Sequence, residues 1–134
     1  MKILNRILPI LFSGLLIWSC SSKPQIDINL NEGEKWEVNS AMKPHIEKGE
    51  DILKAYEVNE DQDYLQLANK LKEQNQALIK SCTMKGASHD ELHKWLHPHM
   101  DLISKLGKAE NPEQAEGIVD DLEDSFQVFH DFFK

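Results

Sequence analysis

The chain carries a set of side chains that could bind a transition metal. They are a cysteine, two methionines and four histidines: Cys82, Met42, Met84, His45, His89, His93 and His130. Thiolates, thioethers and imidazoles are the ligands that suit Cu(I) and Zn(II), and sulfur favours the softer ion. His89 and His93 are four residues apart, which places both side chains on one face of a helix. The residue types therefore suggest a copper or zinc site.

Each of these residues also has an ordinary structural explanation. A histidine that faces the core is more often a hydrogen-bonded structural residue, and methionine and cysteine are common core residues. His89, His93 and His97 form a His-x3-His-x3-His pattern, but no CxxC or HExxH motif accompanies it. The hypothesis therefore depends on whether the fold brings the donors together.

Hydrophobic periodicity and helix-terminal residues predict four helices. The first covers about Trp36 to Tyr56, and Pro44 means that it either begins near Lys43 or kinks there. The second follows the capping residues Asp61 and Asp63 and runs to Cys82. The third opens with a capping box, Ser88 to Glu91, is bent at Pro98 and ends at Gly107. The fourth begins at Asn111-Pro112 and runs through Phe133.

Short links between the helices predict antiparallel neighbours, so the expected fold class is all-α. Residues 35–134 should form an up-down-up-down four-helix bundle. In that topology the start of the first and third helices and the end of the second and fourth lie at one end, where the candidate donors would converge. Helical phase places His99 toward the core, His97 outward and His130 on a flank from which it could turn inward.

The N-terminal residues predict export from the cytoplasm. Residues 1–19 combine Lys2 and Arg6 with an apolar stretch, as in a secretory signal peptide. Ile17-Trp18-Ser19-Cys20 resembles the lipobox of bacterial lipoproteins, in which Cys20 would carry the lipid; the alternative is an ordinary signal peptide with a chance cysteine. The polar residues 20–34 should then be a flexible, lipidated tether. We expect a membrane-anchored protein of the cell envelope, with its domain facing the periplasm or the exterior.

A second resemblance concerns the helical part of the chain. Met42, Met84-Lys85-x3-His89 and the stretch from Ala109 to Lys134, with Gln127 to Phe133 at its end, are similar to the cytochrome b562 family of periplasmic four-helix bundles. The resemblance implies haem b with Met42 and His130 as axial ligands. The sequence departs from the family in a shorter link before the third helix, in Pro44 close to Met42, and in the lack of an arginine to attach to the haem edge. A CxxCH motif for covalent haem is absent.

Composition excludes several function classes. The net charge is −8 and the only arginine is Arg6, so nucleic-acid binding is not expected. No nucleophile elbow, phosphate loop or paired-carboxylate motif is present, so we do not expect an enzyme. Three hypotheses follow: a bundle that buffers, senses or delivers copper or zinc, with an envelope metal-transport or redox partner; a b-type haem electron carrier; and a non-catalytic interaction module.

Overall fold

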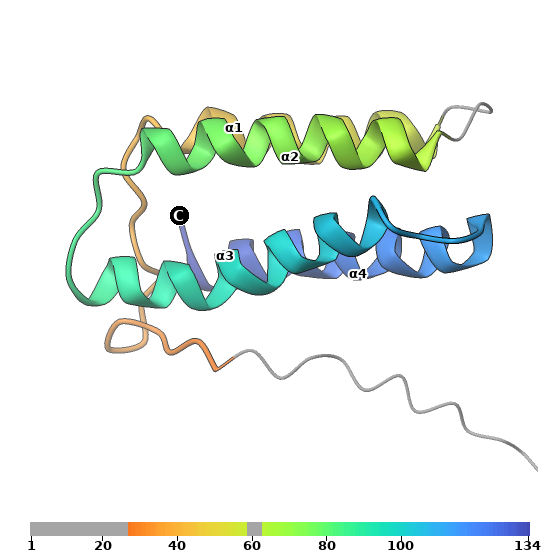
Figure 1. Cartoon of the computed structure of the whole chain (residues 1–134). Helices are drawn as coiled ribbons and strands as arrows, with labels where there is room; N and C mark the ends of the chain where they lie inside the picture. Colours follow the sequence, from red (N-terminus) through yellow and green to blue (C-terminus); the bar gives the residue numbers. More distant parts are fainter. Residues whose placement is uncertain (1–26, 59–62) are drawn as a thin grey trace, which may run out of the picture.

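The computed structural model describes residues 27–58 and 63–134, which form four helices. They are α1 (Lys43–Glu57), α2 (Tyr64–Ser81), α3 (Ala87–Leu106) and α4 (Pro112–Phe132). Figure 1 shows two layers, with α1 and α2 side by side in one and α3 and α4 in the other. The predicted all-α, up-down four-helix bundle is confirmed.

The starts of three helices follow the residues that the sequence singled out. α1 begins at Lys43 with Pro44 in its first turn, so the start near Lys43 is correct and residues 36–42 lie outside the helix. Proline suits this position because the first helical N–H groups have no partner within the helix. Asp63 caps α2 by accepting from the Gln66 N–H at 2.9 Å, and Asn111 caps α4 in the same way.

The predicted capping box at the start of α3 is wrong. α3 begins at Ala87, after Gly86 at φ 68°, a backbone conformation that glycine adopts without steric cost. The Ser88 hydroxyl donates to the Lys85 carbonyl, and the Glu91 carboxylate accepts from the Asn29 N–H at 2.9 Å and from the Lys94 ammonium at 2.8 Å. Glu91 therefore binds the N-terminal segment instead of closing the helix end. The helix runs on through Pro98.

Packing of the domain begins before residue 35. Ile28 is only 6% exposed, and the Trp36 indole N–H donates to the Asn29 carbonyl at 2.6 Å. Residues 27–34, assigned above to a flexible tether, thus lie against the bundle because they contribute an apolar side chain and hydrogen bonds to it. Residues 1–26, which include the predicted signal peptide and Cys20, and the predicted cap Asp61 lie outside the described residues.

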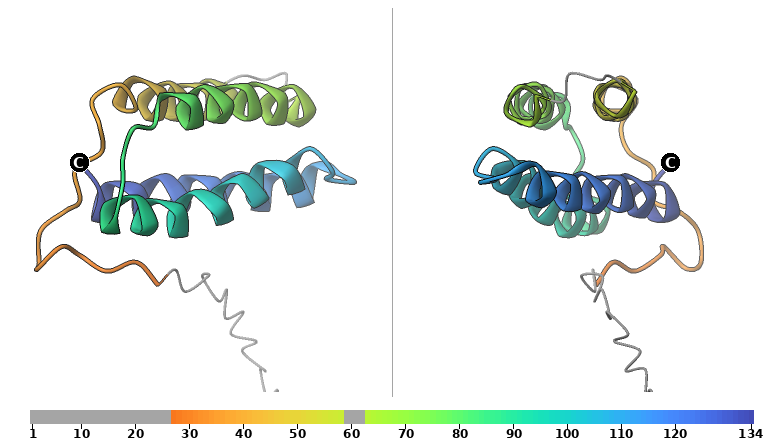
Figure 2. Two further views of the ribbon diagram at one scale, coloured as in Figure 1. Left: turned by 60° about the vertical axis from the view of Figure 1, so that its left-hand side comes forward. Right: turned by 90° about the vertical axis from the view of Figure 1, so that its right-hand side faces the viewer.

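A short parallel pairing joins the two ends of the described chain. The Trp36 N–H donates to the Phe132 carbonyl at 2.8 Å, and the Lys134 N–H donates to the Trp36 carbonyl at 2.9 Å. The Val38 N–H donates to the Lys134 carbonyl at 3.0 Å. We call residues 27–42 the N-terminal strap. In Figures 1 and 2 the strap crosses the end of the bundle where α2 ends, α3 starts and α4 ends. The predicted convergence of these helix ends is confirmed.

Buried hydrogen bonds join α3 and α4 within the core. The Trp95 indole N–H donates to the Ser125 carbonyl at 2.7 Å, and His99 Nδ1 lies 2.8 Å from the Ser125 hydroxyl. The His99 ring stacks on Trp95, with ring centroids 4.7 Å apart, and is only 1% exposed. Burial lowers the pKa of His99 to about 3, so the ring is neutral in the folded protein. His99 faces the core as predicted, and its role there is structural.

The depressed pKa of His99 makes folding stability depend on pH. The unfolded chain binds a proton at His99 below about pH 6.5 while the folded chain does not, so this residue lowers stability progressively from pH 6.5 toward pH 3. Denaturant unfolding of the native chain and of His99→Phe, which keeps an aromatic ring, should be measured as a function of pH. The unfolding free energy of the native chain minus that of the variant should fall by about 1.4 kcal/mol per pH unit between pH 6 and 4. An unfolding free energy that depends on pH in the same way in both proteins would contradict the low pKa of His99.

Two helical glycines should respond oppositely to alanine. A Cβ at Gly49 in α1 would lie 3.0 Å from Phe126 Cζ in the core, whereas one at Gly117 in α4 meets nothing within 4 Å. Gly117→Ala should stabilise by roughly 0.5–1 kcal/mol because alanine is the better helix former. Gly49→Ala should destabilise, because overpacking costs about 1–3 kcal/mol and exceeds that gain. Thermal unfolding of both variants tests this; a Gly49→Ala protein as stable as Gly117→Ala would contradict the packing.

Candidate metal centre

On α3, His93 lies within hydrogen-bond distance of both His89 and His97. His93 Nε2 is 3.1 Å from His89 Nε2, and His93 Nδ1 is 2.9 Å from His97 Nε2. The ring centroids are 4.3 Å apart in the first pair and 5.1 Å apart in the second. We call His89, His93 and His97 the histidine row. His89 and His93 are half-buried and His97 is exposed, so the predicted outward position of His97 is confirmed.

The spacing within the row suits two ligands of one ion better than three. A tetrahedral zinc with Zn–N distances of about 2.0–2.1 Å separates two ligand nitrogens by roughly 3.3 Å. The Nε2 atoms of His89 and His93 are already close to that separation. His93 uses its other nitrogen toward His97, and such a bond orients a ligand histidine and fixes its tautomer. His89 and His93 are therefore a candidate ligand pair, with His97 as a positioning residue.

The surroundings of the row favour the neutral form of its central ring, because they lower the pKa of His93. Desolvation lowers the pKa of His93 first, and positive charge on His89 or His97 lowers it further. The Asp90 carboxylate acts in the opposite direction on His93, and it lies 3.9 Å from His89 Nδ1. A neutral imidazole has a free lone pair for a metal, so His93 can act as a ligand without first losing a proton.

Of the sulfur donors predicted for the site, Met42 belongs to the packed interior, and Cys82 and Met84 lie at its edge. Met42 is the N-cap residue of α1 and is 1% exposed. Cys82 is the C-cap residue of α2, a free thiol that is half-buried against the core, and Met84 is half-buried there too. Within residues 27–58 and 63–134, no group of three or more His, Cys, Asp or Glu side chains could hold a metal ion. The fold thus brings the candidate donors to one end of the bundle without assembling a complete coordination sphere.

The other two candidate histidines have partners on neighbouring helices. His45 Nδ1 lies 2.8 Å from the Gln74 side-chain nitrogen, which also donates to the His45 carbonyl. His130 Nε2 lies 2.6 Å from a Glu50 carboxylate oxygen. Sequence reasoning missed Gln74 and Glu50, because a contact between two helices carries no local spacing signal. Asp131, in contrast, accepts from Gln127 at the ordinary i, i+4 distance of a helix.

The described residues do not fit haem between Met42 and His130. Met42 is enclosed in the core, and His130 is exposed and bonded to Glu50 on the surface. Neither residue lines the groove between α1 and α2, the groove between α2 and α3, or the groove between α3 and α4. Two axial ligands need a shared cavity, and here one donor faces the interior while the other faces solvent.

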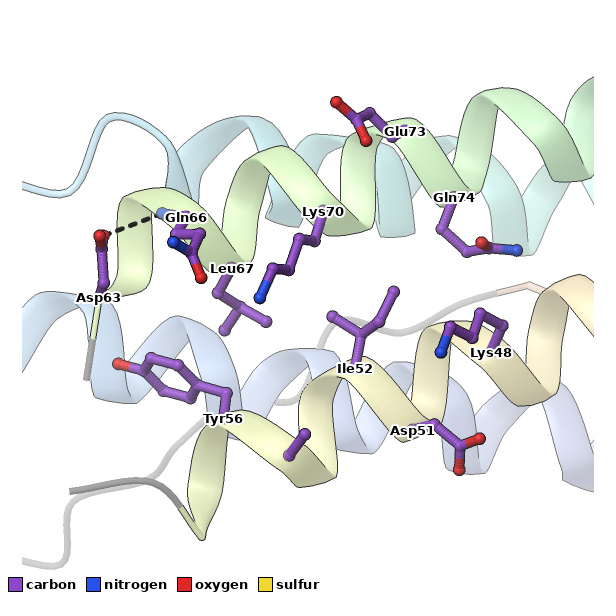
Figure 3. Close-up of a pocket in the computed structure, with 11 residues that line it drawn as sticks. Lys48, Asp51, Ile52, Tyr56, Asp63, Gln66, Leu67, Lys70, Glu73 and Gln74 are labelled. Carbon is purple, nitrogen blue, oxygen red and sulfur yellow. Dashed lines mark hydrogen bonds between the residues drawn. The ribbon is translucent and has the colours of Figure 1, made fainter. Parts of the chain in front are cut away.

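The three grooves lie between neighbouring helices. The groove between α1 and α2, shown in Figure 3, has a volume of about 520 Å³ and carries both lysines and carboxylates around Ile52 and Leu67. The groove between α3 and α4 is lined by several aspartates and has a volume of about 380 Å³. The groove between α2 and α3 differs from both, since it is lined by lysines, amides and apolar side chains without a carboxylate.

Comparison with known proteins assigns no family to this bundle. No protein-family model matches the chain, and no curated protein or solved structure matches it either. In the described part of the chain, none of the helices has the length and apolar character needed to cross a bilayer. The function of the protein is therefore inferred from its own residues and their geometry.

Proposed function

We propose that this protein is a membrane-anchored, non-enzymatic metal-binding protein of the cell envelope that takes up zinc or Cu(II) at the histidine row. The observation that carries the proposal is the 3.1 Å separation of the Nε2 atoms of His89 and His93 on α3. Imidazole is a ligand for zinc and for copper in its divalent state, whereas Cu(I) prefers sulfur. Since the sulfur atoms of Met42, Cys82 and Met84 lie in or against the core, we favour the divalent ions.

A site with two protein ligands suits a protein that buffers or delivers a metal. Structural zinc sites are closed by four protein ligands, and sites with fewer keep positions for water or another molecule. His89 and His93 leave two positions of a tetrahedral ion open, and the half-buried row is accessible from solvent. An envelope metal-transport partner could therefore supply further ligands and remove the ion, and we propose that this exchange is the function of the open site.

Zinc titration of the purified domain tests the site. The native chain should bind one Zn²⁺ per molecule in calorimetry. His89→Gln or His93→Gln should abolish that binding, because each variant removes one of the two protein ligands. His97→Gln should weaken affinity by roughly tenfold, as expected when a residue that orients a ligand is lost. His130→Gln is the matched control, since His130 bonds Glu50 on α1 instead of joining the row.

Two outcomes would overturn the metal proposal. Zinc binding that survives His93→Gln would show that the ion lies elsewhere. Absence of saturable binding of both Zn²⁺ and Cu²⁺ by the native chain would favour the alternative of a non-catalytic interaction module. A Soret band after addition of haem, lost in His130→Ala, would instead support the b-type haem carrier with Met42 and His130 as axial ligands.

The anchor is tested separately from the metal. We propose that Cys20 carries a lipid, because the residues before it resemble a lipobox and residues 1–19 resemble a signal peptide. The native chain expressed with its N-terminus should fractionate with membranes, and its mass should include acyl groups on Cys20. Cys20→Ser should release the protein from the membrane fraction while zinc binding is unchanged. Membrane association that persists in Cys20→Ser would contradict acylation at this residue.

A further inference from the structure

We propose that the groove between α2 and α3 binds a small organic anion with an aliphatic body, of the medium-chain alkyl carboxylate class. This goes beyond the proposed metal function, because none of the residues that line the groove belongs to the histidine row. The volume of about 370 Å³ lies in the range of roughly 300–1,000 Å³ that is typical of small-molecule sites. Three parts of the lining of this groove support such a ligand independently.

The first part is an unsatisfied hydrogen-bond donor. Asn75 of α2 lines the groove and is only 9% exposed, and its side-chain Nδ2 is buried without a hydrogen-bond partner. Leaving a buried polar group unpaired costs about 1–3 kcal/mol, so such a group calls for an explanation in a native structure. An acceptor oxygen in the groove would supply the partner that Nδ2 lacks. The donor therefore favours a ligand that carries an acceptor, such as a carboxylate.

The second part is the local charge. Lys72 of α2 and Lys108, which follows α3, line the groove, and none of its lining residues is acidic. This is unusual for a chain with 23 acidic residues and a net charge of −8. The groove between α1 and α2 (Figure 3) is lined by both positively and negatively charged side chains, and the groove between α3 and α4 is lined mainly by aspartates. Charge complementarity therefore selects an anion at this groove and not at the other two.

The third part is exposed apolar surface beside these donors. Ile79 of α2 and Met100 of α3 are each 42% exposed and line the groove, and Ile103, which is 4% exposed, lines it from the core. Methionine adapts to irregular apolar ligands because its side chain is unbranched and polarizable. Covering Ile79 and Met100 with an alkyl chain would remove apolar area from water. A ligand with an apolar body and one anionic group would therefore match both the apolar side chains and the hydrogen-bond donors that line the groove.

Calorimetric titration of the full, folded chain with decanoate tests the proposal. Decanoate should bind saturably, whereas decyltrimethylammonium, which has an alkyl chain of similar length and the opposite charge, should bind at least tenfold more weakly. The double variant Lys72→Glu/Lys108→Glu should reduce decanoate affinity by at least tenfold. Its matched control is Lys48→Glu/Lys70→Glu in the groove between α1 and α2, which makes the same change in net charge and should leave affinity unchanged.

A second variant separates the amide from the charge. Asn75→Leu removes the unpartnered donor at similar volume, so it should raise the melting temperature of the free protein and weaken decanoate binding relative to decanol binding. Circular dichroism of each variant checks that the helices are intact. The proposal would be overturned if decanoate and decyltrimethylammonium bound equally well, if both charge-reversal variants lost the same affinity for decanoate, or if decanoate showed no saturable binding. Zinc binding to the histidine row is unaffected by any of these outcomes.

Discussion

The buried contact of Trp95 and His99 with Ser125 fixes how α3 is rotated in the bundle. Both rings are enclosed by the core, and each forms a hydrogen bond to the same residue of α4. A different rotation of α3 would bury these polar atoms without partners, which costs about 1–3 kcal/mol for each atom. At about 100° per residue, a core-facing His99 turns His97 away from the core and leaves His89 and His93 on the flank. The same rotation brings Met100 to the edge of α2.

One helix therefore presents three different chemical environments. Its inner face holds His99, which stays neutral because it is buried away from water. Its flank holds imidazoles that are partly exposed to solvent and lie in contact with one another. The next turns of the helix, at Met100 and Ile103, contribute to an apolar groove with lysines and an amide from α2 and the following loop. The residue type is the same at His93 and His99, and only the surroundings decide which is structural and which is a candidate ligand.

Much of this arrangement was predictable because it depends on local signals. Periodicity located the four helices, Asp63 and Asn111 capped the helices that follow them, and helical phase placed His97 and His99 correctly. The predicted capping box at Ser88 failed because Gly86, with its positive φ, is the N-cap of α3 two residues earlier in the chain, and because Glu91 accepts a hydrogen bond from the distant Asn29. The pairing of His130 with Glu50, the role of Gln74 and the isolation of the sulfur donors depend on contacts between helices, and periodicity within one helix does not encode them.

The backbone pairing of Trp36 with Phe132 and Lys134 also has a mechanical meaning. A pull on the chain before residue 27 would act first on the strap. The Asn29–Glu91 hydrogen bond and the backbone pairing hold the strap to α3 and to the end of α4, so these bonds would have to break before the pull acts on the start of α1.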